Sequence, residues 1–408
     1  MSLDSRTETE DLAKGSREPR LGIIAPLLRR LLAGIRSGRL TIVTPSGARL
    51  EHRTAVQGPE AVIAFHDWRA LLRIISGGDV GFAEAYIAGE WSTPDLAALM
   101  TMIAQHGDYL ERALLGRVPL RILGRLRHLR NRNSKAGSRR NIAFHYDLGN
   151  DFYRLWLDQS MTYSSALYDD PRLALEDAQR AKQAQVIDHL ALNGGERVLE
   201  IGCGWGSLAM LLGRGGAEVV ALSLSERQLD HARELVRAEG VADRVEFRLE
   251  DYRDTGGCFD RIVSIEMLEA VGEEYWPVYF AKLRQLLKAG GRAVLQVITI
   301  GEDRFDNYRK GADFIQRYIF PGGMLPTKAI VAERLRCAGL TPISVTSFGD
   351  SYALTLAEWR RRFLQAWPKI EQLGFGVPFR RMWEYYLAYC EAGFRTGYLD
   401  VNLYAIAG

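Results

Sequence analysis

Three glycines and one carboxylate meet at the end of an expected buried strand. The strand is the apolar run Val198-Leu-Glu-Ile201, which carries the acid Glu200, and Gly202, Gly204 and Gly206 follow it. Because glycine has no Cβ, a ligand can approach this backbone closely. A strand, a glycine turn and a helix also form the first crossover of a nucleotide-binding α/β sheet, in which ligands lie at the carboxyl ends of the strands.

The charge on the strand indicates the kind of ligand better than the glycines do. The spacing G-x-G-x-G is weak evidence, and it differs from the dinucleotide pattern G-x-G-x-x-G, whose last glycine would be Ser207. An acid two residues before the first glycine, Glu200, is better explained by a cationic ligand. The pattern therefore favours S-adenosylmethionine (SAM), which carries a sulfonium, over another nucleotide or a purely structural turn.

Polar side chains after the next two expected strands suit the rest of such a ligand. Ser223 and Gln228 follow the second strand and can offer a hydroxyl and an amide to a ribose. Asp251 and Tyr252 follow the third strand and offer a carboxylate to an adenine amine and a ring to its edge. The competing interpretation of Asp251 is a helix N-cap or a turn residue.

Two glutamates after the fourth strand are candidates for the chemical step. Glu269 lies in Ser264-Ile-Glu-Met-Leu-Glu-Ala-Val-Gly272 behind a mostly apolar strand, and Glu266 is the competing candidate in the same segment. A carboxylate beside a sulfonium can stabilise developing positive charge or orient a proton acceptor. The alternative is a surface glutamate that opens a helix.

These residues need a parallel sheet to bring them together. Between 140 and 301, strand-like and helix-like patterns alternate, which predicts an α/β fold with a doubly wound parallel sheet. This is the Rossmann-like architecture of class I SAM methyltransferases. The mostly apolar segments expected as strands are 198–201, 218–222, 245–249, 261–265 and 292–298, and 398–407 closes the chain as a strand.

The chain divides into four predicted parts. Residues 1–19 are polar and are expected to be disordered. Residues 20–105 combine a hairpin pattern with helices and lack a nucleotide motif, so we expect a small N-terminal α+β domain for binding or assembly. Residues 106–140 are predicted to be a basic linker, and 141–408 to be a catalytic domain with helical and aromatic insertions. The aromatic-rich helical region 354–392 is either core or the wall of an apolar tunnel.

The predicted linker carries charge of one sign. Between Arg121 and Arg140 there are seven arginines, one lysine and no acid, with apolar residues interleaved. Such a run is usually a solvated face, but its length favours anionic headgroups, near which each cation contributes roughly 1 kcal/mol. RNA is the competing partner. The run has no aromatic residue for base stacking, which argues against nucleic acid.

The composition is that of a globular protein of 408 residues, with 47% hydrophobic residues, 25% charged residues and a net charge of +3. No apolar run is long enough for a transmembrane helix, and Met1 to Arg20 does not resemble a signal peptide. The four cysteines have no metal-binding spacing, so no metal site is predicted. We expect a cytoplasmic protein that associates peripherally with the inner membrane.

Seven segments of the chain together resemble one protein family. The chain is similar to the cyclopropane fatty acid synthases, including their mycolic-acid-modifying relatives, over roughly residues 60 to 408. The matching segments are His145-Tyr-Asp-Leu-Gly-Asn-Asp151, Met161-Thr-Tyr-Ser164, Val198–Gly206, Glu250-Asp-Tyr-Arg253, Phe259-Asp-Arg-Ile-Val-Ser264, Tyr318-Ile-Phe-Pro-Gly322 and Tyr386–Arg395.

This resemblance implies SAM-dependent methyl transfer to a cis double bond in a phospholipid acyl chain, which gives a cyclopropane when a ring closes. It also implies that the N-terminal domain helps to engage lipid and supports a homodimer. The residues that the resemblance places around SAM are Tyr163, Ser164, Gly202, Gly204, Ser223, Gln228, Asp251 and Tyr252.

The resemblance further implies a bound bicarbonate as the base, held by a Cys, a Glu, a His, a backbone group and a Tyr. Glu269, the Ile300 backbone and Tyr352 match three of these positions, whereas Ser165 replaces the Cys and Ile298 replaces the His. Ser165 can still form a hydrogen bond and the Ile298 side chain cannot. Cyclopropane and methyl-branched unsaturated products therefore both remain open, with a slight preference for the cyclopropane because the Glu and the Tyr are kept.

Two other functions compete with lipid methylation. The first is a SAM methyltransferase that acts on a small soluble molecule, against which the arginine-rich linker and the aromatic C-terminal region argue. The second is a lipid-binding protein that retains a relic SAM fold. The intact glycine turn and the residues suited to ribose and adenine argue against that reading.

Overall fold

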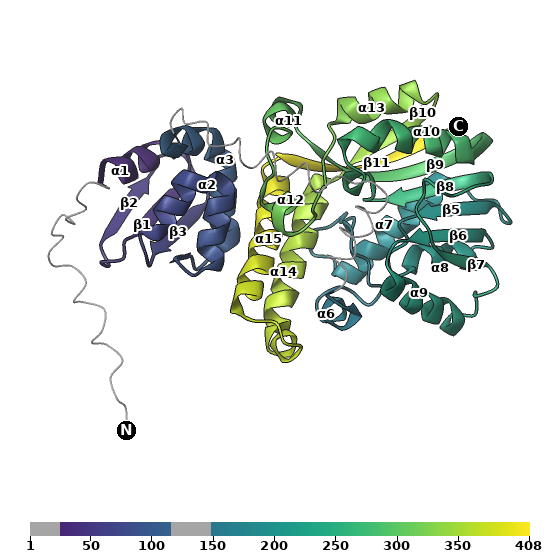
Figure 1. Ribbon diagram of the computed structural model, residues 1–408, viewed down its shortest axis with the longest axis horizontal. Helices are drawn as coiled ribbons and strands as arrows, with labels where there is room; N and C mark the ends of the chain where they lie inside the picture. Colours follow the sequence, from purple (N-terminus) through teal and green to yellow (C-terminus); the bar gives the residue numbers. More distant parts are fainter. Residues whose placement is uncertain (1–24, 116–147) are drawn as a thin grey trace.

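The computed structural model describes residues 25–115 and 148–408, which form two domains side by side (Figure 1). The predicted tail 1–19 and most of the predicted linker 106–140 lie outside these residues. Helix α3 (Leu96–Leu115) extends to Leu115, so the first part of that predicted linker is helical. Within the described ranges, no helix is both long enough and apolar enough to cross a membrane.

The N-terminal domain is a small sheet covered by helices. Its strand order is β2-β1-β3-β4, with β1 and β2 antiparallel and β1 and β3 parallel. Every second residue of β1 and β3 is buried, so one face of the sheet packs on the helices. Its elements are α1 (Ala25–Ala33), β1 (Arg39–Val43), β2 (Arg49–Arg53), β3 (Glu60–Phe65), α2 (Arg69–Ile87), β4 (Trp91–Ser92) and α3.

The second domain contains a seven-stranded sheet in the order β10-β11-β9-β8-β5-β6-β7. Strands β5 to β9 pair in parallel, and β11 runs antiparallel to both β9 and β10. This topology confirms the predicted doubly wound α/β fold. The strands are β5 (Arg197–Ile201), β6 (Glu218–Ser223), β7 (Val245–Leu249), β8 (Phe259–Ile265), β9 (Leu287–Ile300), β10 (Thr341–Ser347) and β11 (Leu399–Ala407).

Helices lie on both faces of this sheet (Figure 1). Central strands covered on both faces are nearly continuous apolar runs, and Val198, Leu199 and Ile201 of β5 are all buried. The covering helices are α7 (Leu175–Leu190), α8 (Ser207–Arg214), α9 (Glu226–Ala238), α10 (Trp276–Leu286) and α13 (Lys328–Cys337). The shorter elements are α6 (Asn150–Arg154), η3 (Leu268–Ala270), η4 (Glu273–Tyr275), α11 (Glu302–Tyr308) and α12 (Phe314–Tyr318).

A long helical hairpin stands between the two domains. Helices α14 (Gly349–Gln372) and α15 (Val377–Arg395) pack on each other, and α15 contacts α2 and α3 of the N-terminal domain (Figure 1). The aromatic residues of 354–392 were expected to be either core or the wall of an apolar tunnel, and the structure shows some in each position. Trp359 and Trp383 are buried in the core, whereas Tyr386 and Tyr389 line a cavity.

Candidate active site

A cavity of about 1260 Å³ lies at the carboxyl ends of β5, β6 and β8 and extends to the N-terminal domain. Pockets for one small molecule usually measure roughly 300–1,000 Å³, so this cavity has room for a cofactor and a second molecule. Residues of the N-terminal domain that line it include Leu40, Ile42, Ile63, Phe65, Ile74 and Val80. Aromatic residues of the second domain that line it are Tyr163, Tyr252, Tyr308, Phe320, Tyr352, Tyr385, Tyr386, Tyr389, Phe394 and Tyr398, with Trp205.

The glycine turn after β5 needs its glycines for two reasons. All three have positive φ, 83° at Gly202, 52° at Gly204 and 87° at Gly206, where a side chain would be strained. A Cβ on Gly202 would lie 2.8 Å from Met267 Cγ, and one on Gly206 would lie 2.6 Å from Ala232 Cβ. A Cβ on Gly204 would meet nothing within 4 Å. The turn is therefore packed at its ends and open in the middle, where a ligand can approach.

Glu200 supplies buried negative charge beside this turn. Its side chain is buried, and its Oε2 atom has no hydrogen-bond partner among the described residues. Burial raises the pKa of Glu200 to about 8, although the nearby Lys182 ammonium acts in the opposite direction. A buried polar atom without a partner is costly. The site therefore fits a ligand that brings positive charge or a donor, as SAM does.

The residues predicted to hold ribose and adenine come together at the same cavity. Ser223, Gln228, Asp251 and Tyr252 all line it. Ser223 Oγ donates to Gln228 Oε1 at 2.9 Å, which fixes both side chains at the start of α9. The Asp251 carboxylate accepts the backbone N–H of Arg253 at 3.0 Å and pairs with its guanidinium at 2.6 Å. Asp251 is thus a turn residue as well as a cavity residue.

The loop before α7 carries the other two predicted SAM residues, Tyr163 and Ser164, which also line the cavity. The hydroxyls of Tyr163 and Tyr386 are hydrogen-bonded at 2.8 Å. Lys182 Nζ donates to Ser164 Oγ at 2.8 Å, and Gln179 Nε2 donates to the Ser164 carbonyl at 2.9 Å. Helix α7 therefore determines where this loop meets the cofactor.

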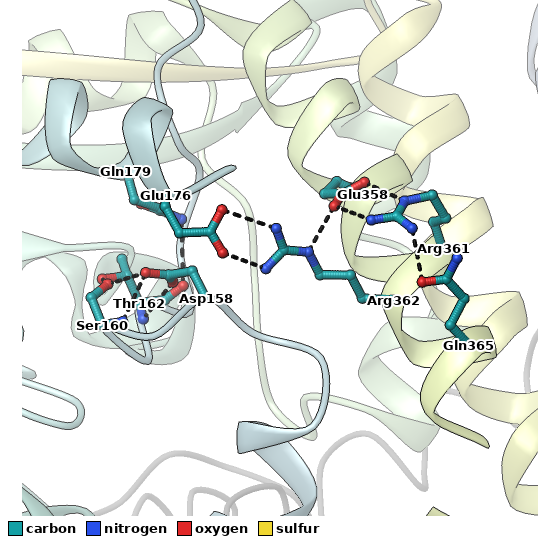
Figure 2. Close-up of polar contacts among 9 residues, drawn as sticks. All are labelled: Asp158, Ser160, Thr162, Glu176, Gln179, Glu358, Arg361, Arg362 and Gln365. Carbon is teal, nitrogen blue, oxygen red and sulfur yellow. Dashed lines mark hydrogen bonds and ion pairs between the residues drawn. The ribbon is translucent and has the colours of Figure 1, made fainter. Parts of the chain in front are cut away.

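The turn preceding that loop is fixed by a carboxylate (Figure 2). Asp158 accepts the backbone N–H groups of Ser160 at 2.9 Å and Thr162 at 3.2 Å. At the start of α7, Arg362 of α14 donates to both oxygens of Glu176, at 2.7 and 3.0 Å. The turn at Asp158 therefore fixes the start of the loop, and Arg362 links α7, which follows the loop, to α14.

Glu266 lies at the centre of a hydrogen-bond cluster on the cavity wall. Its Oε1 accepts from the Ser165 N–H at 2.8 Å and from Gln296 Nε2 at 2.7 Å, and its Oε2 accepts from the Tyr352 hydroxyl at 2.6 Å. Its φ is 50°, in the left-handed region. Burial raises the pKa of Glu266, while these three hydrogen bonds and Lys182 limit that rise. The cluster holds a carboxylate firmly against the cavity.

Glu269 lies one turn further on, in η3, and also lines the cavity. Its Oε1 accepts the backbone N–H of Ile298, whereas its buried Oε2 has no hydrogen-bond partner among the described residues. Burial, together with the neighbouring negative charge of Glu266, raises the pKa of Glu269 to about 8. Two carboxylates therefore face the cavity close to the cofactor residues, as the sequence predicted for Glu269.

The family model named mycolic acid cyclopropane synthetase matches residues 133–404, about two thirds of the chain. The chain belongs to this family. It is 44% identical over 359 residues to a tuberculostearic acid methyltransferase of Mycobacterium tuberculosis, which covers 85% of this chain and 84% of that protein. It is 36% identical over 335 residues to the cyclopropane-fatty-acyl-phospholipid synthase of Escherichia coli K12, which covers 82% of this chain and 84% of that protein.

Solved structures of the family agree with this assignment. The crystal structure of mycolic acid cyclopropane synthase CmaA1 complexed with SAH and CTAB matches with a TM-score of 0.62 and 32% identity, over 66% of this chain and 98% of that one. The cyclopropane synthase MmaA2 from Mycobacterium tuberculosis matches with the same TM-score of 0.62 and 30% identity, over 66% of this chain and 98% of that one. This member of the family is a SAM-dependent methyltransferase that modifies lipid acyl chains, as predicted, and SAM is its cofactor.

Three of the residues expected to clasp bicarbonate, Ser165, Ile300 and Tyr352, have hydrogen-bond partners within the chain. The Ser165 hydroxyl donates to the Ala166 carbonyl at 2.9 Å, and the Ile300 N–H donates to the Pro326 carbonyl at 3.0 Å. Both groups are thus hydrogen-bonded within the chain, and the roles expected of Ser165 and Ile300 stay predictions. The Tyr352 hydroxyl and the Ser165 N–H donate to Glu266, so a carboxylate of the chain already takes donors that an anion would need, and the residues present do not fit bicarbonate.

Proposed function

We propose that the protein transfers the methyl group of SAM to the cis double bond of an unsaturated phospholipid acyl chain and releases a methyl-branched unsaturated chain. The observation that carries the proposal is the single cavity that joins the cofactor residues to an apolar wall and to two carboxylates, Glu266 and Glu269. A small polar acceptor would not need such a wall. A small-molecule methyltransferase therefore fits the cavity less well.

The chemistry explains why an apolar wall is needed. When bound, SAM supplies an electrophilic methyl group. An isolated alkene is a weak nucleophile, so the protein must hold it in line with that methyl group and exclude water. Tyr352 and Tyr386 line the cavity, and aromatic rings there can stabilise the positive charge that then develops on the chain. Glu266 and Glu269 offer negative charge to the same region.

The identity of the product depends on which proton leaves. Loss from a chain carbon gives a methyl-branched alkene, and loss from the transferred methyl group closes a cyclopropane ring. The branched product is supported by the similarity to a tuberculostearic acid methyltransferase at 44% identity and to a probable fatty acid methyltransferase of Pseudomonas putida at 38%. The exchange of two residues of the expected clasp, at Ser165 and Ile298, supports it as well.

Cyclopropane formation is the second candidate function. It is favoured by the similarity to the synthase of Escherichia coli at 36% identity and by the presence of Glu269 and Tyr352. The decisive experiment is mass spectrometry and proton NMR of cis-unsaturated phospholipid liposomes after incubation with the protein and SAM. A gain of one CH₂ with a new branched methyl group and an olefinic proton supports our proposal. High-field cyclopropyl protons would instead show that the protein is a cyclopropane synthase. The absence of any mass gain would overturn both candidate functions.

The acceptor also implies where the protein works. We propose that it associates peripherally with the cytoplasmic face of an anionic inner membrane and forms a homodimer. The support for the membrane contact is the run of seven arginines between 121 and 140, which lies outside the described residues, and the homodimer follows from the resemblance to the family alone. Replacing all seven by glutamine should abolish co-sedimentation with anionic vesicles and leave SAM affinity unchanged. Binding that survives the replacement, or that ignores salt, would contradict an electrostatic contact.

A further inference from the structure

Glu266 is a carboxylate that the protein has surrounded with donors. Three donors meet it: the Ser165 N–H at 2.8 Å, Gln296 Nε2 at 2.7 Å and the Tyr352 hydroxyl at 2.6 Å. Two of these bonds go to Oε1 and one goes to Oε2. A carboxylate can accept about four hydrogen bonds, so Oε2 keeps capacity for one more on a side chain that lines the cavity.

The backbone of Glu266 is unfavourable for any residue with a Cβ. Its φ of 50° lies in the left-handed region, which costs an L-residue other than glycine or asparagine roughly 1–2 kcal/mol. The backbone N–H of Glu266 donates to the Gln296 carbonyl at 2.8 Å, a bond that glycine would make equally well. The turn therefore does not need a glutamate. Strain of this kind persists at sites where the side chain is used.

The geometry points to Glu266 as the proton acceptor of the reaction, a carboxylate built into the chain in the place where a diffusible anion would otherwise bind. This inference rests on the proposed function. Ser165, Gln296 and Tyr352 act as positioning residues that aim the carboxylate at the cavity. A second anion there would place another negative charge beside the Glu266 carboxylate, which like charges disfavour.

The proposed step balances within the residues and substrates named. The π pair of the alkene forms the new C–C bond to the methyl group, and the C–S pair stays on sulfur. The adjacent chain carbon becomes cationic. Glu266 then takes a proton from a chain carbon bonded to the cationic carbon. The electron pair of that C–H bond becomes the second bond of the new C=C double bond. Glu266 returns the proton to water after the product leaves, and no oxidant or reductant is consumed.

The test compares Glu266→Gly and Glu266→Gln with the wild type in buffer stripped of carbon dioxide. We expect the wild type to turn over at the same rate with and without added bicarbonate. Both variants should lose about 10²–10⁴-fold in turnover, the range of a general base, while their SAM affinity stays within about twofold of the wild type. Added bicarbonate or acetate should restore at least part of the activity of Glu266→Gly, because removal of the side chain leaves the three donors free.

The control is Glu273→Gln, a carboxylate of the next short helix that is paired with Arg309 at 2.6 Å, and its turnover should be unchanged. Bicarbonate binding is measured separately by calorimetry, which does not depend on the lipid acceptor. We expect none to the wild type and measurable binding to Glu266→Gly. A wild type that binds or requires bicarbonate, or a fully active Glu266→Gly in stripped buffer, overturns the inference. If the wild type neither methylates lipid nor binds bicarbonate, the proposed function is refuted. The calorimetric result would still support Glu266 as the carboxylate that takes the place of a bound anion.

Discussion

At the scale of single residues, the cavity wall carries more buried acid than base. Glu200 and Asp251 are buried and line it together with the buried Lys182, and the half-buried Glu266 and Glu269 line it as well. Burial raises the pKa of the three glutamates and lowers the pKa of Lys182 to about 8. In a low-dielectric site each charge needs a partner. A ligand with a positive charge on sulfur would therefore give the buried Glu200 carboxyl the partner that its Oε2 atom lacks among the described residues.

This imbalance predicts that SAM binding releases a proton. The pKa of Glu200 is about 8 in the protein without ligand, and a nearby cation favours the ionised form and lowers that value. Just below pH 8 the bound state should hold fewer protons than the free state. Calorimetric titrations in buffers of different ionisation enthalpy measure this release. It should vanish in Glu200→Gln, and a heat that is independent of the buffer in the wild type would contradict the prediction.

Glu269 should shape both activity and stability as the pH changes. Its pKa of about 8 in the folded protein exceeds its ordinary value of 4.5. Between these values the unfolded chain binds fewer protons than the folded one, so this group makes stability fall as the pH rises from 4.5 to 8. The stability of Glu269→Gln should not fall over this pH range because of this group. Its melting temperature should therefore exceed that of the wild type at pH 8 but not at pH 4.5.

The same variant should lose about 10²-fold or more in turnover, the scale of one preorganised polar group. The wild-type rate should rise as the pH passes through 8, because only the ionised Glu269 stabilises a cation. Rate profiles of both proteins on liposomes measure this dependence. An unchanged rate in Glu269→Gln would remove Glu269 from the mechanism.

The sequence allows some of these residues to be predicted and conceals others. Glu200 and the glycine turn follow from local spacing, since strand, turn and helix are contiguous. The role of Glu266 depends on donors from distant segments, at Ser165, Gln296 and Tyr352, and on a backbone angle that no residue pattern reveals. The sequence indicated a role for Glu266 only through its position in the segment that follows the fourth strand.

At the scale of elements, the loop with Tyr163 and Ser164 is positioned by α7, and α7 is tied to α14 by one arginine (Figure 2). Arg362 donates to both Glu176 oxygens across the two helices and to Glu358 on its own helix. A paired, planar guanidinium of this kind fixes orientation as well as distance. The tie therefore holds α7 against α14, which carries Tyr352. It acts together with two direct hydrogen bonds from the segment after Ser164 to α14, from the Ala166 N–H to Thr355 at 3.1 Å and from the Tyr168 N–H to Ser351 at 3.0 Å.

Arg362→Met should loosen the packing of α7 against α14. We expect a loss of about 1.5–3 kcal/mol in the free energy of unfolding, the range for hydrogen bonds to charged groups, together with weaker SAM binding. Arg361→Met is the matched control, because the partners of Arg361 among the described residues are Glu358 and Gln365 on its own helix. Its effect should stay within about 0.5 kcal/mol. Denaturant unfolding and calorimetry measure both variants, and equal effects in the two would contradict a tie between helices.

The elements themselves were predictable where a pattern is strong and local. Strands β5, β6, β8 and β9 follow from mostly apolar runs, and the hairpin of β1 and β2 follows from its turn residues. Strand β7 at the sheet edge has a weaker pattern, since only Val245 of its five residues is buried. The parallel pairing of β1 with β3 has no local signal, because it joins segments across β2. The aromatic stripe of α15 could not be assigned to core or cavity, since helical spacing gives a face but not what that face meets.

At the scale of the whole molecule, the cavity that we propose for the acyl chain depends on the contact between the two domains. Ile42, Ile63 and Ile74 of the N-terminal domain line the same cavity as the cofactor residues. The contact is polar as well as apolar, since Tyr86 of α2 donates to Glu384 of α15 at 3.1 Å. A change at this interface should therefore alter lipid use more than SAM binding, because the SAM residues belong to the second domain alone.

Glu84 offers a direct test of that separation. On α2 it accepts the Tyr318 hydroxyl at 2.5 Å and pairs with Arg317 at 3.0 Å, and both partners lie in α12 of the second domain. Glu84→Gln removes the charge and should raise the KM for phospholipid liposomes by a factor of about five, which corresponds to the upper end, about 1 kcal/mol, for a partly exposed pair. The SAM dissociation constant should not change. Glu60→Gln, which breaks a pair with Arg39 inside the N-terminal domain, should alter neither constant, and an equal shift in both variants would mean that the domain contact does not shape the acyl site.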